Sequence, residues 1–532
     1  MKYFKVFALL LKATIILAQF NYELKLNPVN IEGLPGLHSY AFGQSNNMWL
    51  IIGGRLDGLH ARQPFNSFPE SSNNKNILVV DPIQKRFWSR SLAELNTAMK
   101  EQLQSTNMNF HQVGDTLYII GGYAFSNSQG NHITFPYLTT IRISELINGI
   151  ITNEMNINKY FKQVMHEDFA VTGGHLATIR DTFILVGGHR FDGRYNPMGN
   201  PTFTQKYTNA VRRFKILNND TIIKVTHLTP IVDEFHLHRR DYNLIPRINI
   251  DNTLGYTISS GVFQHTADLP FLYPVDINSN SIRPITSFNQ YLSNYHSAVA
   301  NVYSSINKTQ FSIFIGGMSQ YYYLNDSLIK DDNVPFTKTI SVVQRKNDTL
   351  MEEFKLPLEL NNFKGASAEF IKNNDIHHLH DDFADIDNIN SDTITLGYVY
   401  GGISSNSLNP FVNNQTNTTS ADATIFEVVL IKKKQSTGLA KIKSNPSIKS
   451  TVYPNPAENN ITVSIQFPES GTIYITWLDV TGKIIKRQIA NVQEGDALIN
   501  MTLPEQASPG NLSLIINLNH RFVVNHQIQR VK

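Results

Sequence analysis

The chain of 532 residues has a formal net charge of +3 and 17% charged residues, which does not fit the strongly basic composition of nucleic-acid-binding proteins. It contains no cysteine, which excludes disulfides, thiolate metal sites and cysteine nucleophiles. A chain of this length exceeds one ordinary hydrophobic core, so we expect several domains or internal repeats.

Residues 1–18 have the layout of a secretory signal peptide. Lys2 and Lys5 give a basic start, residues 6–17 form an apolar body, and Ala18 provides a small residue for cleavage before Gln19. Because Lys12 interrupts the apolar body, a buried N-terminal strand or helix is the alternative interpretation. No later apolar run in the sequence is long enough to span a membrane.

An apolar strand that ends in paired glycines recurs six times. The runs are rich in Ile, Val and aromatic residues, which is typical of strands buried on both faces. A glycine pair allows a positive φ and a close approach of neighbouring backbone. In the fourth copy, Ser260 replaces the first glycine. Recurrence of this kind predicts a repeat architecture, with the copies ending at residues 54, 122, 188, 261, 317 and 402.

Further predicted strands accompany each copy. A short segment precedes the glycine strand, and in the first unit a third strand (77–82) and a fourth strand around Phe87 and Trp88 follow it. Four strands in each of six units predict an all-β, six-bladed β-propeller. The last unit lacks a fourth strand, so we expect residues 22–26 to supply it and leave no open sheet edge.

The succession of apolar strand, Gly-Gly, variable loop, strand ending in Asp81 and outer-strand Trp88 resembles the kelch family. The resemblance covers roughly residues 20–434 and implies a kelch-like propeller over residues 19–434, with glycine pairs near 53, 121, 187, 260, 316 and 401. The later units keep the glycines but mostly lose the Trp. Galactose oxidase also has kelch repeats, but its copper–radical site requires a cysteine linked to tyrosine. The absence of cysteine excludes that site, and no cofactor is expected.

A basic linker, residues 435–449, precedes a small β-sandwich domain predicted over residues 450–532. The Tyr453-Pro454-Asn455-Pro456 start and the Asp479-Val480-Thr481-Gly482-Lys483 turn resemble the C-terminal sorting domain of the type IX secretion system. The resemblance implies handling by the type IX machinery and a secreted or cell-surface location on a Gram-negative bacterium. An ordinary immunoglobulin-like accessory domain is the alternative.

In each predicted unit, antiparallel pairing places the start of the first strand and the end of the second strand on the same face. The long second-to-third connections emerge on that face, whereas the links on the opposite face are short and should build no deep pocket. Arginine forks, carboxylates and aromatic rings gathered there suit a polar ligand. The candidate ligand-binding residues are Arg55, Asp57, Tyr123, His189, Arg190, Asp192, Arg194, His38, His111, His175 and His296.

Structural roles are equally compatible with these residues. The histidines fit hydrogen-bonded spacers between blades, and the repeated Arg-x-Asp-Gly phrase at Arg55 and Arg190 fits a salt-bridged turn. If the two arginines are site residues, both should be at least partly exposed. Weak metal-binding candidates are His378, His380 and Asp382, in a stretch that also fits a solvated loop.

Two hypotheses about function follow. In the first, the chain is a secreted binding protein that holds a glycan or protein ligand at the propeller mouth. In the second, the same mouth is a carbohydrate-active enzyme site, as in kelch-like sialic-acid mutarotases, with His189 facing Arg55 and Arg190. No nucleophile elbow, zinc-protease helix motif, phosphate loop or dinucleotide fingerprint is present.

Overall fold

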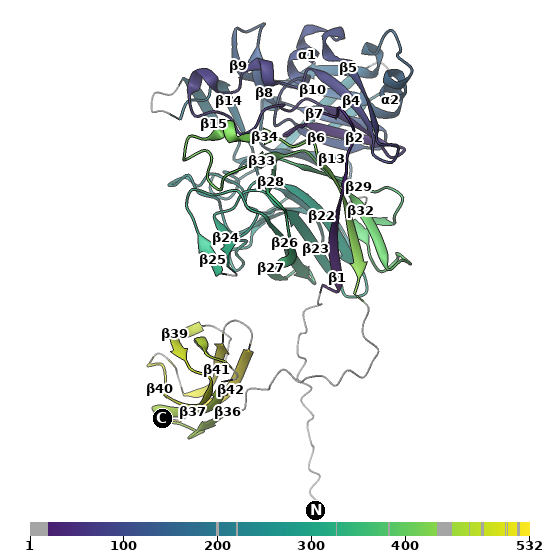
Figure 1. Cartoon of the computed structure of the whole chain (residues 1–532). Helices are drawn as coiled ribbons and strands as arrows, with labels where there is room; N and C mark the ends of the chain where they lie inside the picture. The colour runs from purple at the N-terminus through teal and green to yellow at the C-terminus, as the bar shows by residue number, and fades with distance from the viewer. Residues whose placement is uncertain are drawn as a thin grey trace, which may run out of the picture. The chain divides into compact units, whose positions relative to one another are not determined.

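The computed structural model divides the chain into two compact units, Met1–Lys433 and Lys434–Lys532 (Figure 1). It describes residues 20–197, 202–219, 222–325, 327–380, 383–433, 450–467, 469–479, 484–505, 507, 509–518 and 522–531. The predicted signal peptide and the predicted linker lie outside the described residues. The two units are described separately.

The first unit is built from six antiparallel four-stranded arrangements, so the predicted all-β class is confirmed. Sheets 1 to 5 follow the chain, and each begins with a strand that pairs with the next strand along the sequence. Sheet 5 carries the additional pair β31 (Phe383–Asp385) and β30 (His378–Leu379) beside its first strand. Their strands are β2 (Ala41–Ser45), β3 (Met48–Ile52), β4 (Asn76–Asp81) and β5 (Arg86–Ser91) in sheet 1; β6 (Asn109–Val113), β7 (Thr116–Ile120), β10 (Tyr137–Arg142) and β11 (Phe161–Met165) in sheet 2; β12 (His175–Ile179), β13 (Thr182–Val186), β16 (Ala210–Asn218) and β17 (Ile223–Val232) in sheet 3; β18 (Leu244–Ile248), β19 (Leu254–Ile258), β20 (Val275–Ile277) and β21 (Ile282–Pro284) in sheet 4; β22 (Ala298–Ser304), β23 (Thr309–Ile315), β26 (Thr339–Lys346) and β27 (Leu350–Glu359) in sheet 5; and β29 (Glu369–Lys372), β32 (Thr393–Tyr400), β35 (Ile425–Lys432) and β1 (Tyr22–Val29) in sheet 6.

The six predicted glycine strands are the second strands of the six sheets: β3, β7, β13, β19, β23 and β32. The degenerate fourth copy behaves like the others, because Gly261 after β19 also has a positive φ of +92°. At the first glycine of a pair, a side chain has no room. A Cβ on Gly121 would lie 1.8 Å from the carbonyl oxygen of Val171, in the segment that leads into sheet 3.

The second glycine of each pair bonds to the next sheet. Its amide donates to a carbonyl in the segment that leads into that sheet, over 2.8 to 3.2 Å, and the series returns from sheet 6 to sheet 1. The pairs are Gly54 to Ser105, Gly122 to Val171, Gly188 to Arg239, Gly261 to Asn294, Gly317 to Lys364 and Gly402 to Leu37. The paired glycines therefore allow the backbones of successive sheets to approach closely and form hydrogen bonds.

A second cyclic series of backbone hydrogen bonds lies just ahead of the first strands. Six residues, one per sheet, each donate an amide to the carbonyl of the preceding one, over 2.8 to 3.2 Å, and Ser39 closes the series by donating to Ser367. We call these residues the hub ring: Ser39, Asn107, Gly173, Asp241, His296 and Ser367. All except His296 have a positive φ, between 50° and 66°.

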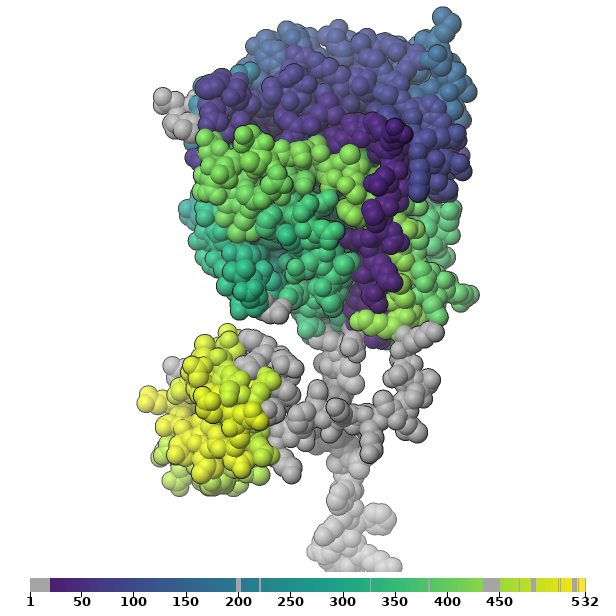
Figure 2. Space-filling model, viewed as in Figure 1, coloured from purple at the N-terminus to yellow at the C-terminus, as the bar shows by residue number. Residues whose placement is uncertain are grey.

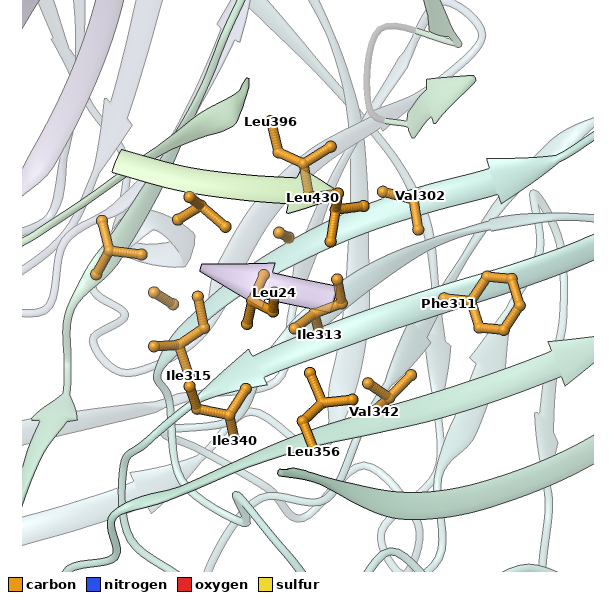
Figure 3. Packing of buried hydrophobic residues seen from close by; sticks show 14 of the residues in the cluster. Leu24, Val302, Phe311, Ile313, Ile315, Ile340, Val342, Leu356, Leu396 and Leu430 are labelled. Carbon is orange, nitrogen blue, oxygen red and sulfur yellow. The ribbon is translucent and has the colours of Figure 1, made fainter. Parts of the chain in front are cut away.

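The N-terminal strand β1 completes sheet 6, so the predicted pairing is confirmed. It runs antiparallel to β35, from Tyr22 opposite Lys432 to Val29 opposite Ile425. Figure 2 shows this segment as a purple strip on the surface between teal and green residues. Its Leu24 is buried beside Leu430 and Ile313, in the apolar cluster that joins sheets 5 and 6 (Figure 3).

Short extra strands lie in four of the second-to-third connections and, in one case, in the segment that leads into β29, and they gather on one side of the unit, at the left in Figure 1. Thr134 on one hairpin accepts at its hydroxyl from the amide of Phe191 on another, which ties two of them together. Two α-helices of the described residues, α1 (Thr97–Leu103) and α2 (Ile143–Ile151), lie in other connections. The extra strands are β8 (Tyr123–Ser126) with β9 (Asn131–Thr134), β14 (His189–Gly193) with β15 (Phe203–Tyr207), β24 (Tyr321–Leu324) with β25 (Ser327–Lys330), and β33 (Ile403–Ser405) with β28 (Phe363–Ala366) and β34 (Thr419–Ala421).

The second unit has two sheets over a common apolar core that contains the fully buried Trp477. Alternating exposure along β37 (Asn460–Phe467) and β38 (Gly471–Leu478) gives each sheet one core face. The first sheet consists of β36 (Ser450–Tyr453), β37 and β40 (Gly495–Thr502), and the second consists of β39 (Ile484–Val492), β38, β41 (Gly510–Leu518) and β42 (Phe522–Arg530).

Candidate functional site

Arg55, directly after the first glycine pair, is buried in an ion pair. Its Nε and Nη2 donate to the two carboxylate oxygens of Asp57 over 2.8 and 2.5 Å, and its Nη1 donates to Asn73 over 3.0 Å. Burial raises the pKa of Asp57, but hydrogen bonds from His38 and Arg55 outweigh it and hold the pKa at about 2. Because Arg55 is only 2% exposed, the expectation that it is partly exposed is wrong. The Arg-x-Asp-Gly phrase forms a salt-bridged turn here.

The equivalent phrase in the third unit points outward. Arg190 contacts Asp192 over 2.5 Å and Glu167 over 2.7 Å, with 44% of its side chain exposed. The neighbouring His189 is buried, with its Nδ1 2.7 Å from Gln205 Nε2. Burial, with the charge of Arg240 adding to it, lowers the pKa of His189 well below 6.5. Consecutive strand residues face opposite ways, so His189, Arg55 and Arg190 do not converge as an acid–base trio.

Tyr123 and Asp192 form hydrogen bonds between neighbouring hairpins. The buried Tyr123 hydroxyl donates to the carbonyl of Gly193 over 2.7 Å, and Asp192 accepts the amide of Thr134 over 3.0 Å. Arg194 is half-buried, and its Nη1 donates to the carbonyl of Phe65 over 3.2 Å. Among the described residues, Arg194 has no carboxylate partner, whereas Asp192 is paired with Arg190.

Two of the strand histidines, His111 and His175, contact the neighbouring sheet. His111 lies two residues inside β6, and its Nε2 is 3.1 Å from the Thr178 hydroxyl of the next sheet. His175, at the first residue of β12, has its Nε2 2.6 Å from the carbonyl of Tyr242. Both therefore act as hydrogen-bonded spacers between neighbouring sheets, and burial lowers the pKa of each to about 4.

The hub-ring residues themselves line a small cavity of about 40 Å³, together with residues such as His175 and Glu369. His296 Nε2 is 3.5 Å from the Glu369 carboxylate, and the two histidine rings are 5.3 Å apart. Burial lowers the pKa of His296 to about 3 and raises that of Glu369 well above 4.5. The cavity has room for only a few water molecules, so a sugar cannot enter it.

Beside the hub ring, half-buried aromatic and cationic side chains from five of the six units, all but the second, come together. We call these the mouth cluster: His60, Arg62, Tyr195, Tyr207, Arg240, Phe263, Tyr295 and Phe411. The His60 ring lies 4.6 Å from Tyr195 and 5.4 Å from Phe411.

Within the mouth cluster, Arg240 contacts both Tyr207 and Phe263. Its Nε donates to the Tyr207 hydroxyl over 3.3 Å, and its guanidinium lies 4.7 Å from the Phe263 ring centre. Its charge also acts on Tyr195 and Tyr295. Sequence reasoning missed this cluster except Arg194 beside it. The available signal was positional, because Arg240 occupies the place of His38, directly before a hub-ring residue.

The charges of the mouth cluster are unevenly compensated. Arg240 pairs with the Asp241 carboxylate. Arg62 contacts only the carbonyl of Val412 and the ring of Phe411 among the described residues, and its buried Nε has no hydrogen-bond partner there. Burial lowers the pKa of His60 to about 4, and the nearby charges of Arg240 and Arg55 act in the same direction. The mouth cluster thus offers positive charge beside neutral aromatic faces.

The opposite face is not as shallow as its short links suggested. A cavity of about 490 Å³ is lined by turn residues of sheets 3, 4 and 5, among them Arg180 and Asp251, so that expectation is wrong. The arginines that line this cavity are mostly paired with carboxylates of the protein itself. Arg247 donates to both oxygens of Asp348 over 2.8 and 2.9 Å, and Arg283 contacts the buried Asp276 over 2.7 Å.

The weak metal-binding candidates do not form a group of ligands among the described residues. His378 and His380 flank a short hairpin, and Asp382 lies outside the described residues. Of the neighbouring acids, Asp385 is fully buried and accepts from Asn388, while Asp387 accepts from the Ser304 hydroxyl.

Comparisons with known proteins give weak structural similarities. Chains of YjhT (12% identity, 77% of this chain and 98% of that chain, TM-score 0.43) and of PorZ, a surface component of the type IX secretion system of Porphyromonas gingivalis (9%, 94% and 60%, 0.28), are similar to it. A family 43 arabinoxylan arabinofuranohydrolase from Bacillus subtilis is similar at 11% identity, over 93% of this chain and 95% of that chain, with a TM-score of 0.27. At these identities and TM-scores, the similarities carry no argument about activity. No curated protein sequence matches the chain.

The C-terminal unit gives the one firm assignment. The predicted sorting domain is confirmed, because residues 451–507 match the family of secretion system C-terminal sorting domains. Within the described part of the chain, no helix is both long and apolar enough to cross a membrane. The chain is thus a substrate of type IX secretion, destined for the cell surface or the extracellular space.

Proposed function

We propose that residues 20–433 form a six-bladed, kelch-like β-propeller that is displayed outside the cell and binds an acidic glycan at the mouth cluster. The propeller is supported by the six glycine strands and by the two cyclic series of hydrogen bonds that link each sheet to the next. Each sheet then corresponds to one blade, with β1 as the outer strand of the sixth.

The observation that carries the ligand assignment is the uncompensated charge at the mouth. Arg62 and Arg194 have only carbonyl hydrogen-bond acceptors among the described residues, and the buried Nε of Arg62 has none. A buried donor without a partner is unfavourable and is satisfied when an acceptor arrives. The two oxygens of a carboxylate can accept two parallel hydrogen bonds from one guanidinium group. A carboxylate on the ligand would therefore satisfy the free donors of these arginines.

The aromatic rings explain why the partner is a sugar. Tyr195, Tyr207 and Phe411 are half-buried and present both an apolar face and, for the tyrosines, a polar tip. Sugar rings have the same mixture of apolar C–H faces and hydroxyl edges. The small cavity lined by the hub ring is too small for a ligand of that size, so binding takes place on the mouth cluster and not in that cavity.

The test is a binding screen of the purified full chain against acidic polysaccharides and the same polysaccharides after reduction of their carboxyl groups. We expect binding to the acidic form, weakening with added salt, and no binding to the reduced form. Equal binding to both forms would contradict the role of the arginines. Binding of proteins alone, with no glycan bound, would overturn the choice of ligand class.

A further inference from the structure

Away from the mouth, two histidines and one aspartate meet where sheets 2 and 3 adjoin. His166 follows β11, Asp168 belongs to the short 3₁₀ turn after it, and His227 lies in β17, the outer strand of sheet 3. One ligand atom from each of the three lies within 4.8 Å of the others. We call them the rim triad. No role described so far uses any of them.

From this geometry we infer that the rim triad is a binding site for a zinc-class divalent cation that fastens sheet 2 to sheet 3. The Asp168 carboxylate oxygen Oδ2 lies 3.5 Å from His227 Nδ1 and 3.7 Å from His166 Nδ1. With ligand bonds of 2.0–2.2 Å, the ligand atoms of a tetrahedral zinc ion are about 3.3–3.5 Å apart. Small side-chain movements therefore bring all three onto one ion.

The chemistry of the set favours a transition metal over calcium. Two imidazole nitrogens and one carboxylate oxygen are ligands that zinc accepts, whereas calcium takes six to eight oxygens. The remaining acid nearby, Glu167, is occupied by Arg190 over 2.7 Å. Three protein ligands leave one position of a tetrahedral ion to water.

The surroundings hold the rim triad in place. The imidazole rings of His166 and His227 stack 4.1 Å apart, and Arg212 donates to the backbone carbonyl of Asp168 over 2.5 Å. His166 Nδ1 accepts the Asp168 amide over 3.2 Å, a long bond that metal binding would replace. All three residues are partly exposed, with 47%, 50% and 32% of the side chains of His166, Asp168 and His227 accessible, so an ion can reach them.

The chain supplies its own control. His238 and His265 stack in the same way, with ring centres 3.8 Å apart, but no carboxylate joins them in a group of three among the described residues. If stacked histidines alone bound metal, both pairs would do so. If the carboxylate is needed, only the rim triad should bind tightly.

The experiment uses the full chain, without a polyhistidine tag and freed of metal with a chelator, titrated with Zn²⁺ by calorimetry and checked by metal analysis after dialysis. We expect one tightly held Zn²⁺ per chain and a rise in melting temperature on its addition. Asp168→Asn and His227→Asn should each weaken binding by at least tenfold and abolish the rise, while His265→Asn should change neither.

Because the rim triad is exposed, these variants should fold, which circular dichroism of the metal-free proteins will verify. Cobalt substitution gives an independent readout, because a tetrahedral site with nitrogen and oxygen ligands has a visible absorption band. Failure of the wild-type chain to retain Zn²⁺ would overturn the inference. So would tight binding that Asp168→Asn and His227→Asn leave unchanged.

Discussion

Replacing Gly121 with alanine should separate close packing between sheets from the backbone preference of glycine. Gly121 has a φ of +71°, and a Cβ there would lie 1.8 Å from the carbonyl oxygen of Val171. Gly114, in the turn between β6 and β7, has a φ of +56° and no atom within 4 Å of an added Cβ. Gly114→Ala is therefore a matched control, with the backbone strain but without the contact.

The magnitudes follow from these two environments. A left-handed conformation costs a residue with a Cβ about 1–2 kcal/mol, which is the whole expected effect of Gly114→Ala. Gly121→Ala must also push apart two backbones, and overpacking of this kind costs about 1–3 kcal/mol or more. Loss of the adjacent hydrogen bond from Gly122 to Val171 adds about 1 kcal/mol. The expected total for Gly121→Ala is about 3–6 kcal/mol.

Urea unfolding followed by tryptophan fluorescence measures both variants. We expect the midpoint of Gly121→Ala to fall about three times as far as that of Gly114→Ala. If the two midpoints fell equally, the glycine pairs would serve only the turn, and the contact between successive sheets would not explain their recurrence.

Two other predictions concern sheet 6 and the buried charges of the first unit. Deleting residues 20–30 removes β1, exposes the edge of β35 and uncovers the cluster around Leu24, so we expect aggregation and a lower melting temperature, and an unchanged melting temperature would refute the closing role of β1. Burial raises the pKa of Asp276, but the hydrogen bond and charge of Arg345, with the charge of Arg247, hold it at about 2, below the ordinary 3.8. The stabilisation from this depressed pKa is present above pH 4 and is lost as the pH falls from 3.8 through 2, an effect of about 2 kcal/mol. Asp276→Asn should be destabilised at pH 7 and show a flatter fall in unfolding free energy between pH 5 and pH 2, whereas a parallel fall would show that another group dominates.

The architecture of the first unit was readable from the sequence because its signal is local. Each glycine strand is a short apolar run followed by residues that need a positive φ, and all six became second strands, including the copy with Ser260. The role of residues 22–26 followed from counting strands in the last unit. The sorting domain was predictable for a similar reason, since its opening and turn are contiguous motifs.

The site was harder to predict because it depends on which loop residues meet. The chemistry of Arg55 and Asp57 predicts ligand binding, because both side chains are charged and form hydrogen bonds. Their opposite charges also allow them to pair with each other, and they do so in the interior. Arg62, Arg240 and Phe411 come from connections far apart in the chain, and no spacing rule brings them together. The rim triad could not be predicted for the same reason. His166 and His227 belong to different sheets and meet only where those two sheets adjoin.

The most direct test of the proposed function compares the same substitution on two faces of the first unit. Arg62→Gln changes the mouth cluster, and Arg180→Gln changes an exposed arginine of the cavity on the opposite face. Calorimetric titration with the acidic glycan should show binding at least tenfold weaker in Arg62→Gln, because a hydrogen bond to a charged group contributes about 1.5–3 kcal/mol. Arg180→Gln should bind as the wild type does. Unchanged affinity in Arg62→Gln, or a loss confined to Arg180→Gln, would contradict a binding site at the mouth.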